Sequence, residues 1–255
     1  MEQAGSAILL TTLRNLAKRT PARYLYHRLK AAIGGASQSD ESALLVGLTR
    51  GCPKTFVEFG FHPTEYNCIG LKQFSGLLID GDPNIVKLAQ AILPKNVRAK
   101  QAFLTLENLA ATVDVSEIGA LSIDVDGNDY WFLEALLPRH PHVVCVEYNA
   151  SLGLRPLTVP YDPAFERHAK HPSGWYHGAS LSALTSLCAS QGMKLVAIAA
   201  EGTNAFFARD DHALPALDPQ SAYLENALRN RWSKTTAAWQ WETIKHLPFV
   251  EVGRS

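Results

Sequence analysis

Short apolar runs that alternate with helical patterns are the feature that most limits what this sequence can form. Runs rich in β-branched or large apolar residues lie at 55–58, 76–80, 120–125 and 143–148. Helical patterns lie at 65–73, 83–92 and 131–137. Nearly continuous apolar strands that alternate with helices are typical of a parallel sheet covered on both faces. The sequence therefore predicts an α/β fold with a doubly wound, Rossmann-like, mostly parallel sheet.

Small-residue stretches and helical patterns indicate how the 255-residue chain divides into domains. We expect a helical N-terminal extension over 1–39, a catalytic domain over 40–212 and a helical C-terminal extension over 213–255. The small-residue stretch from Gly34 to Ser39 marks the first boundary. The catalytic domain is expected to end with a helix at 181–191 and strands at 194–199 and 204–208. In the C-terminal extension Trp232, Trp239 and Trp241 are the expected apolar anchors.

Composition excludes several classes of function. Lys+Arg and Asp+Glu number 24 each, so the chain has no overall field suited to nucleic acid. The four cysteines form no C-x-x-C pair, which favours free thiols in a reducing cytoplasm over disulfides or zinc. The basic, amphipathic N-terminal stretch is too short in its apolar part for stable membrane insertion. It is expected to pack on the domain or on the partner of a homodimer, and contact with an anionic surface is the alternative.

Three of the four strand candidates end on a carboxylate, at Glu58, Asp80 and Asp124. Ligands bind at the carboxyl ends of the strands in such sheets. An acid at the end of the second strand can accept both hydroxyl hydrogens of a ribose, and this is the role predicted for Asp80. Pro83 then opens a helix. For Asp82, capping of that helix and a contact with the ligand are both open.

The turn after the first strand argues against a dinucleotide enzyme. Gly60 permits close approach of a ligand to the backbone. The residues that follow it, from Phe61 to Glu65, contain no glycine, so the G-x-G-x-x-G phosphate cradle is absent. A nicotinamide or flavin cofactor is therefore disfavoured.

Acids and an amide gather after the third and fourth strands. Asp124 and Asp126 lie in a D-x-D-G-N-D stretch that lacks the closing glutamate of a calcium loop, since Ala135 stands at that position. They are expected to serve the cofactor, a metal or a substrate proton. Glu147 and Asn149 end the fourth strand, and with Asp124 they could form an oxygen-rich Mg²⁺ site. The alternative is that Glu147 and Asn149 only form hydrogen bonds with the local backbone or with the substrate.

A loop over residues 160–180 combines prolines, glycines, aromatics and histidines, a composition that suits a binding loop. Ser180 is expected to cap the helix that follows. His177 would then lie beside a helix start, near the cleft. Removing the proton of a hydroxyl group suits a base with a pKa near neutrality, and histidine is the usual choice. His177 is therefore the predicted general base.

The motifs, taken in order, resemble FkbM-type methyltransferases. The resemblance covers roughly residues 55–210 and is carried by V-E-F-G at 57–60, L-L-I-D-G-D at 77–82, Ala102-Phe103 before Glu107-Asn108, and S-I-D-V-D-G at 122–127. Asp126 stands where the family has glutamate, and His62-Pro63 where it has a further glycine.

This resemblance implies S-adenosylmethionine over the first two strands. Glu58 and Gly60 would lie at its methionine end, Asp80 at its ribose, and Ala102 and Phe103 beside its adenine. The full expected cofactor set is Glu58, Phe59, Gly60, Asn67, Asp80, Gly81, Asp82, Ala102, Phe103 and Asp124.

The predicted function is S-adenosylmethionine-dependent O-methylation of a small hydroxylated molecule, such as a sugar or a secondary metabolite. The expected catalytic residues are His177, Asp124 and Asp126, with Mg²⁺ as the alternative means of activating the hydroxyl. Two other interpretations stay open. One is a different reaction of the same cofactor, and the other is a binding or scaffold subunit that has lost catalysis.

Overall fold

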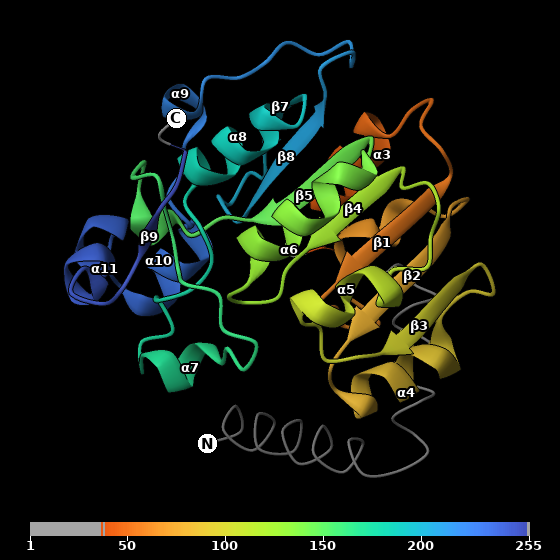
Figure 1. The fold of residues 1–255 in the computed structure, drawn as a ribbon, viewed down its shortest axis with the longest axis horizontal. Helices are drawn as coiled ribbons and strands as arrows, with labels where there is room; N and C mark the ends of the chain where they lie inside the picture. The colour runs from red at the N-terminus through yellow and green to blue at the C-terminus, as the bar shows by residue number, and fades with distance from the viewer. Residues whose placement is uncertain (1–36, 38, 254–255) are drawn as a thin grey trace, which may run out of the picture.

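A seven-stranded sheet forms the centre of the molecule (Figure 1). The computed structural model describes residues 37 and 39–253, so most of the expected N-terminal extension lies outside the described residues. The strands, in the order β3-β2-β1-β4-β5-β8-β7, are β3 (Val97–Gln101), β2 (Ser75–Asp80), β1 (Thr55–Phe59), β4 (Ala120–Ile123), β5 (Val143–Glu147), β8 (Asn204–Arg209) and β7 (Met193–Ile198). All neighbouring pairs among β1–β5 are parallel, whereas β8 runs antiparallel to both β5 and β7. The predicted Rossmann-like α/β class is confirmed.

Successive side chains of the central strands enter two separate cores, as the twofold alternation of a strand requires. In β1, Val57 belongs to one core and Phe56 to the other. The first core is covered by α5 (Leu106–Thr112), α6 (Asp129–Leu136) and α8 (Leu181–Ser190), and the second by α3 (Glu41–Leu48), α4 (Pro83–Ile92) and the 3₁₀ helix η1 (Asn67–Gly70). Burial on both faces explains why these strands are nearly continuous apolar runs.

Two local expectations need correction. The helix expected over 65–73 is only the 3₁₀ turn η1, because Glu58 accepts hydrogen bonds from the backbone N–H groups of Asn67 and Cys68 and fixes a tight turn there. The edge strand β3 was not expected at all. Its sequence, V-R-A-K-Q, has no apolar run, since only Val97 is buried in it.

The C-terminal segment packs against the carboxyl end of β5. It contains α9 (Pro219–Ala222), α10 (Ala227–Ser233), α11 (Ala237–Ile244) and β9 (Val250–Glu251), which pairs with β6 (Leu157–Thr158). The Tyr148 hydroxyl, just after β5, donates to Leu224 O at 2.6 Å. The anchoring expected of the tryptophans is wrong for Trp232 and Trp239, which are 87% and 55% exposed.

The remaining short elements are the 3₁₀ helices η2 (Leu137–Arg139) and η3 (Ala150–Leu152) and the single-turn α7 (Arg167–Lys170). Figure 1 places α7, α10 and α11 on the same side of the sheet. All four cysteines are free thiols, as predicted. Within 37 and 39–253, no helix has the length and hydropathy needed to cross a bilayer.

Candidate active site

A cavity of about 330 Å³ opens at the carboxyl ends of the parallel strands. Seven of the predicted cofactor residues line it: Gly60, Asp80, Gly81, Asp82, Ala102, Phe103 and Asp124. They follow four different strands, so only the parallel sheet brings them together. Glu58 and Asn67 line an adjoining cavity of about 230 Å³ that shares Gly60 and Asp124. Phe59 is fully buried in the core, so its side chain does not reach either cavity.

The turn after β2 presents Asp80 to the cavity and uses Asp82 for the helix. Asp82 caps α4 by accepting a hydrogen bond from Asn84 N at 2.8 Å, with Pro83 in the first turn. The capping role considered for Asp82 is thus present. One oxygen of Asp80 accepts from Asp82 N at 2.7 Å. Partial burial raises the pKa of Asp80 above its usual value.

An exposed aromatic ring flanks the same cavity. Phe103 follows β3, and the residue is 61% exposed although it is large and apolar. A Cβ on Gly81 would lie 3.1 Å from a ring carbon of Phe103, so the glycine leaves room for the ring. An apolar face left in solvent beside a cavity suits stacking against a flat ligand.

Gly60 is required by the protein itself. Its φ is +68°, and a Cβ there would lie 1.6 Å from Asp124 O. The expectation was that this glycine lets a ligand approach the backbone. The structure shows instead that it lets the ends of β1 and β4 approach one another.

Glu58 is held inside the protein below the cavity. Its two oxygens accept from Asn67 N at 2.7 Å and from Cys68 N at 2.9 Å, and the residue is 1% exposed. Burial raises the pKa of Glu58 to about 7, although the two backbone hydrogen bonds oppose that rise. Asn67 Nδ2 donates to Ser122 Oγ at 3.1 Å, which ties η1 to β4.

A second cavity, of about 420 Å³, is lined mainly by polar residues, four of which are acids. Its lining is Gly60, Phe61, Asp80, Asp124, Asp126, Glu147, Arg167, Thr203 and Asn204. One oxygen each of Asp124, Asp126 and Glu147 lies within 4.8 Å of the others. Burial, then the charges of Glu147 and Asp126, raises the pKa of Asp124 well above its usual value. The cavity shares Gly60, Asp80, Asp124 and Asp126 with the 330 Å³ cavity, so the two adjoin.

The loop between β4 and α6 is shaped by a different acid. Asp129 is fully buried, and its carboxylate accepts from Val125 N and Gly127 N, each at 2.9 Å. Between these contacts Asp126 adopts a left-handed φ of +58°, and its side chain is 59% exposed. The acidic stretch thus divides into a buried residue that folds the loop and two residues, Asp124 and Asp126, that face the cavity.

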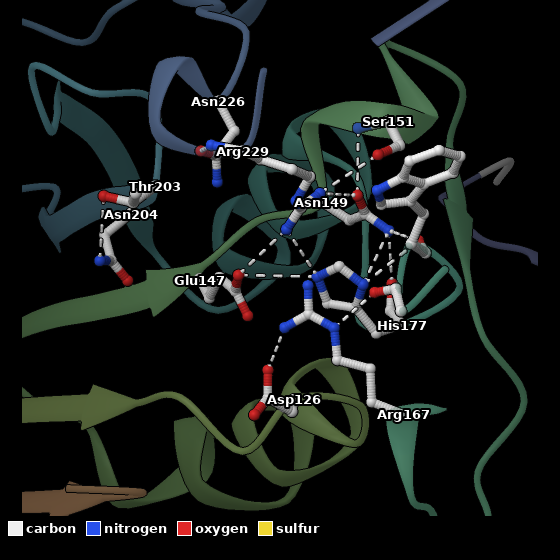
Figure 2. A network of polar contacts seen from close by, with 12 residues as sticks. Asp126, Glu147, Asn149, Ser151, Arg167, His177, Thr203, Asn204, Asn226 and Arg229 are labelled. Carbon is white, nitrogen blue, oxygen red and sulfur yellow. Dashed lines mark hydrogen bonds and ion pairs between the residues drawn. The ribbon is translucent and has the colours of Figure 1, made fainter. Parts of the chain in front are cut away.

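We call the cluster of Asp124, Asp126 and Glu147 the acidic end of the site. Two arginines reach it from segments far along the chain (Figure 2). Arg167, at the start of α7, pairs with Asp126. Arg229, on α10, places Nη2 3.4 Å from Glu147 Oε1. Burial favours the protonated form of Glu147, but the charges of Arg167 and Arg229 outweigh burial and hold the pKa of Glu147 below its usual value. Neither arginine was predicted from the sequence, because no spacing links them to the strand ends.

His177 and Asn149 both contact Arg229. His177 is 1% exposed, and its Nε2 lies 3.0 Å from Arg229 Nη2 and 3.6 Å from Glu147 Oε1. Burial, with the charges of Arg167 and Arg229, lowers the pKa of His177 to about 4. The residues that line the 330 and 420 Å³ cavities do not include His177.

Asn149 does not join the carboxylates as the predicted metal site required. Its Oδ1 accepts from Arg229 Nη1 at 2.8 Å and from Ser151 N at 3.0 Å, and its Nδ2 donates to Trp175 O at 2.7 Å. The third carboxylate beside Asp124 and Glu147 is Asp126. Ser180 caps α8 by accepting from Ala183 N at 3.1 Å, as expected.

Comparison with known proteins gives likenesses of fold. No protein-family model and no curated protein sequence matches this chain. The N-terminal domain of EvdMO1 with SAH bound is similar at 12% identity and a TM-score of 0.43, over 67% of this chain and 79% of that one. A methyltransferase from Geobacter sulfurreducens is similar at 15% identity and a TM-score of 0.41, over 66% and 77%. CalS10, an amino pentose methyltransferase from Micromonospora echinaspora, is similar at 11% identity and a TM-score of 0.43, over 67% and 90%.

Proposed function

We propose that this chain is an S-adenosylmethionine-dependent methyltransferase that methylates an oxygen of a small, polar, hydroxylated molecule, such as a sugar or a secondary metabolite. The observation that carries the proposal is the shared lining of two adjoining cavities. Residues after β1, β2, β3 and β4 form a cofactor-sized cavity of about 330 Å³. That cavity adjoins a second one of about 420 Å³, which is almost wholly polar in its lining residues and suits a hydroxylated acceptor.

The first cavity fits the cofactor in chemistry as well as in size. Asp80 offers carboxylate oxygens to ribose hydroxyls, and the exposed ring of Phe103 offers a stacking face to adenine. Asp124 borders the cavity on the side of the acids. When bound there, S-adenosylmethionine would supply an activated methyl group.

We assign removal of the acceptor's hydroxyl proton to Asp124. Asp124 lines both cavities, so it lies where cofactor and acceptor would meet. Its raised pKa makes its carboxylate a stronger proton acceptor than an ordinary aspartate. His177 is buried behind Glu147 and Arg229, and we assign it the positioning of Arg229, whose Nη2 lies 3.0 Å from His177 Nε2.

The acidic end does not fit Mg²⁺. Asp126 is paired with Arg167 and Glu147 with Arg229, so two of the three carboxylates already have cationic partners. Mg²⁺ requires near-octahedral oxygen ligation at about 2.0–2.1 Å, usually with water. The amide that was to complete the site, Asn149, hydrogen-bonds elsewhere. The proposed reaction therefore uses a side-chain base, and activity is expected to persist in excess chelator.

Calorimetric titration with S-adenosylhomocysteine tests the proposal directly. The wild type is expected to bind it, and Asp80→Ala is expected to weaken binding by about 1.5–3 kcal/mol, the usual scale for hydrogen bonds to a charged group. Asp114→Ala, which removes an exposed carboxylate paired with Arg98, is the matched control and should bind normally. Absence of binding at millimolar ligand would refute the proposal. Binding without methyl transfer to any acceptor would favour a scaffold or a different reaction of the cofactor.

A further inference from the structure

Two buried oxygen atoms at the acidic end have no hydrogen-bond partner. They are Glu147 Oε2 and Asn204 Oδ1, and they are the only such side-chain atoms found among residues 37 and 39–253. Both residues line the 420 Å³ cavity. They stand opposite each other in the antiparallel register of β5 and β8. An unsatisfied buried acceptor is costly, so two of them on residues that line one cavity indicate a ligand that donates hydrogen bonds.

The orientation of the Asn204 amide is fixed from behind. Asn204 is 3% exposed, and its Nδ2 lies 3.3 Å from Glu41 Oε1, a fully buried carboxylate of α3. The Thr203 hydroxyl donates to the same oxygen at 2.7 Å. Rotating the amide by half a turn would set Asn204 Oδ1 against the Glu41 carboxylate. Glu41 therefore keeps Nδ2 on its own side and leaves Oδ1 on the side away from Glu41.

Glu147 contributes a negative charge beside that amide oxygen. Arg229 and His177 lie against its Oε1, at 3.4 and 3.6 Å, which leaves Oε2 without a partner (Figure 2). Four carboxylates line the cavity, from Asp80, Asp124, Asp126 and Glu147, and two arginines offset two of them, Arg167 at Asp126 and Arg229 at Glu147. The excess of negative charge favours a donor that is itself positive.

A protonated amine meets these requirements. An ammonium group has three N–H donors and no acceptor, so a single group has enough donors for both oxygens. A hydroxyl has one donor hydrogen and no charge, so it satisfies one oxygen at most. We propose that the acceptor carries a protonated amine close to its reactive hydroxyl, and that this amine donates to Glu147 Oε2 and Asn204 Oδ1. The inference rests on the proposed function and defines its substrate class as amino alcohols, amino sugars among them.

Matched pairs of probes test the inference on the full chain saturated with S-adenosylhomocysteine. The pairs are glucosamine with glucose and ethanolamine with ethylene glycol, titrated below the pKa of the amines. We expect the amine of each pair to bind more tightly by about 10- to 100-fold, the range for a hydrogen bond to a charged group. Equal affinities within each pair, or no binding of either amine, would overturn the inference.

Variants assign the preference to the two oxygens. Glu147→Gln should remove most of the preference for the amine, because it should weaken the binding of the amine far more than that of the hydroxyl probe. Asn204→Ala, which keeps the Arg229 pair of Glu147 intact, covers the case in which Glu147→Gln does not fold. Asp114→Asn removes an exposed charge paired with Arg98 and should leave the preference as in the wild type. An unchanged preference in both Glu147→Gln and Asn204→Ala would contradict the inference.

Two further readouts separate this inference from its rivals. If Glu147→Gln weakens S-adenosylhomocysteine as much as it weakens the amines, the two oxygens serve the amino group of the cofactor, and the inference is wrong. If the wild type binds Mg²⁺ in calorimetry and Glu147→Gln does not, the oxygens serve a metal, and the inference is again wrong. If the wild type does not bind S-adenosylhomocysteine, the proposed function is refuted. In that case the amine titrations on the free protein still decide whether the two oxygens bind an amine.

Discussion

Arg229 Nη2 lies 3.0 Å from His177 Nε2, and this contact fixes the protonation of the imidazole. A guanidinium group has donors and no acceptor, so Nε2 must supply the lone pair. The ring proton then sits on Nδ1, which lies 3.2 Å from Trp175 O. The lone pair that a general base would use is therefore engaged inside the protein. This relationship is why we assign His177 a positioning role and expect Asp124 to take the proton.

Comparison of two variants tests that assignment. Asp124→Asn should lower kcat by at least about 100-fold, since loss of a general base typically costs about 10²–10⁴ in rate. His177→Asn should lower kcat by less than about tenfold, because the proton acceptor itself remains. Methyl transfer at saturating cofactor and acceptor is the measurement. A fall of about 100-fold or more in a well-folded His177→Asn variant, with Asp124→Asn nearly as active as the wild type, would reverse the two roles.

The buried imidazole should also leave a signature in stability. The pKa of His177 is about 4 in the folded protein against 6.5 as its ordinary value. Between these two pH values the unfolded chain binds more protons, so the stabilisation from this residue falls as the pH drops from about 6.5 to about 4. The loss should be on the order of 3 kcal/mol or less, at about 1.36 kcal/mol per pH unit.

The contribution of His177 is the difference in the free energy of unfolding between wild type and His177→Asn, measured by urea denaturation at each pH. The pH dependence of wild-type stability alone is not sufficient, because burial also raises the pKa of Glu58 and of Asp129 to about 7. Those two acids favour the folded state at low pH and so slope the opposite way. A wild-type-minus-variant difference that stays constant between about pH 4 and about 6.5 would show that His177 is not held neutral by the fold.

Removing Arg229 from its buried pair with Glu147 should lower the free energy of unfolding far more than removing Arg98 from its exposed pair with Asp114. Arg229 is 9% exposed and Glu147 13% exposed at the side chain. Arg229→Gln leaves the Glu147 charge buried without its partner and should lower the free energy of unfolding by about 3–5 kcal/mol. Arg98→Gln breaks the exposed pair with Asp114 and should cost less than about 1 kcal/mol. Urea denaturation measures both, and similar losses would mean that Glu147 is not ionised in the fold.

Gly60 and Gly51 offer a matched test of the close contact between β1 and β4. Both have positive φ, +68° and +83°, so alanine is strained at either position. Around Gly51 a Cβ would meet nothing within 4 Å, whereas at Gly60 it would lie 1.6 Å from Asp124 O. Gly51→Ala should therefore cost about 1–2 kcal/mol, from the backbone conformation alone. Gly60→Ala should cost clearly more and should also weaken S-adenosylhomocysteine, and equal losses would contradict the role assigned to Gly60.

The positions of two site carboxylates were predictable because each of them ends an apolar run in the sequence. Asp80 and Asp124 could be assigned to one edge of a parallel sheet from their positions in the sequence alone. The edge strand β3 escaped because half-exposed edge residues carry no apolar run. Arg167 and Arg229 escaped for a different reason. Each lies in a short helix far from the strands in sequence, and only tertiary packing brings it to Asp126 or Glu147.

The histidine was the least predictable residue. His177 does precede a helix capped by Ser180, as its position in the sequence suggested. Whether such a ring faces a cavity or the interior depends on neighbours from other segments, here Arg229 on α10 and Glu147 on β5. No local pattern records that choice, so the sequence could place His177 beside a helix start but could not predict what its ring contacts.

The pairing of Glu147 with Asn204 in the β5–β8 register has a consequence for how the protein becomes active during synthesis. The strands that carry the proposed cofactor cavity, β1 to β4, emerge from the ribosome before β5 and β8. The part of the 420 Å³ cavity that Asn204 forms must wait until β8 is made, and Arg229 can pair with Glu147 only after α10 is made. These contacts close long loops, which form slowly. We therefore expect a nascent chain to acquire the strands of the proposed cofactor cavity before the lining of the proposed acceptor cavity is complete.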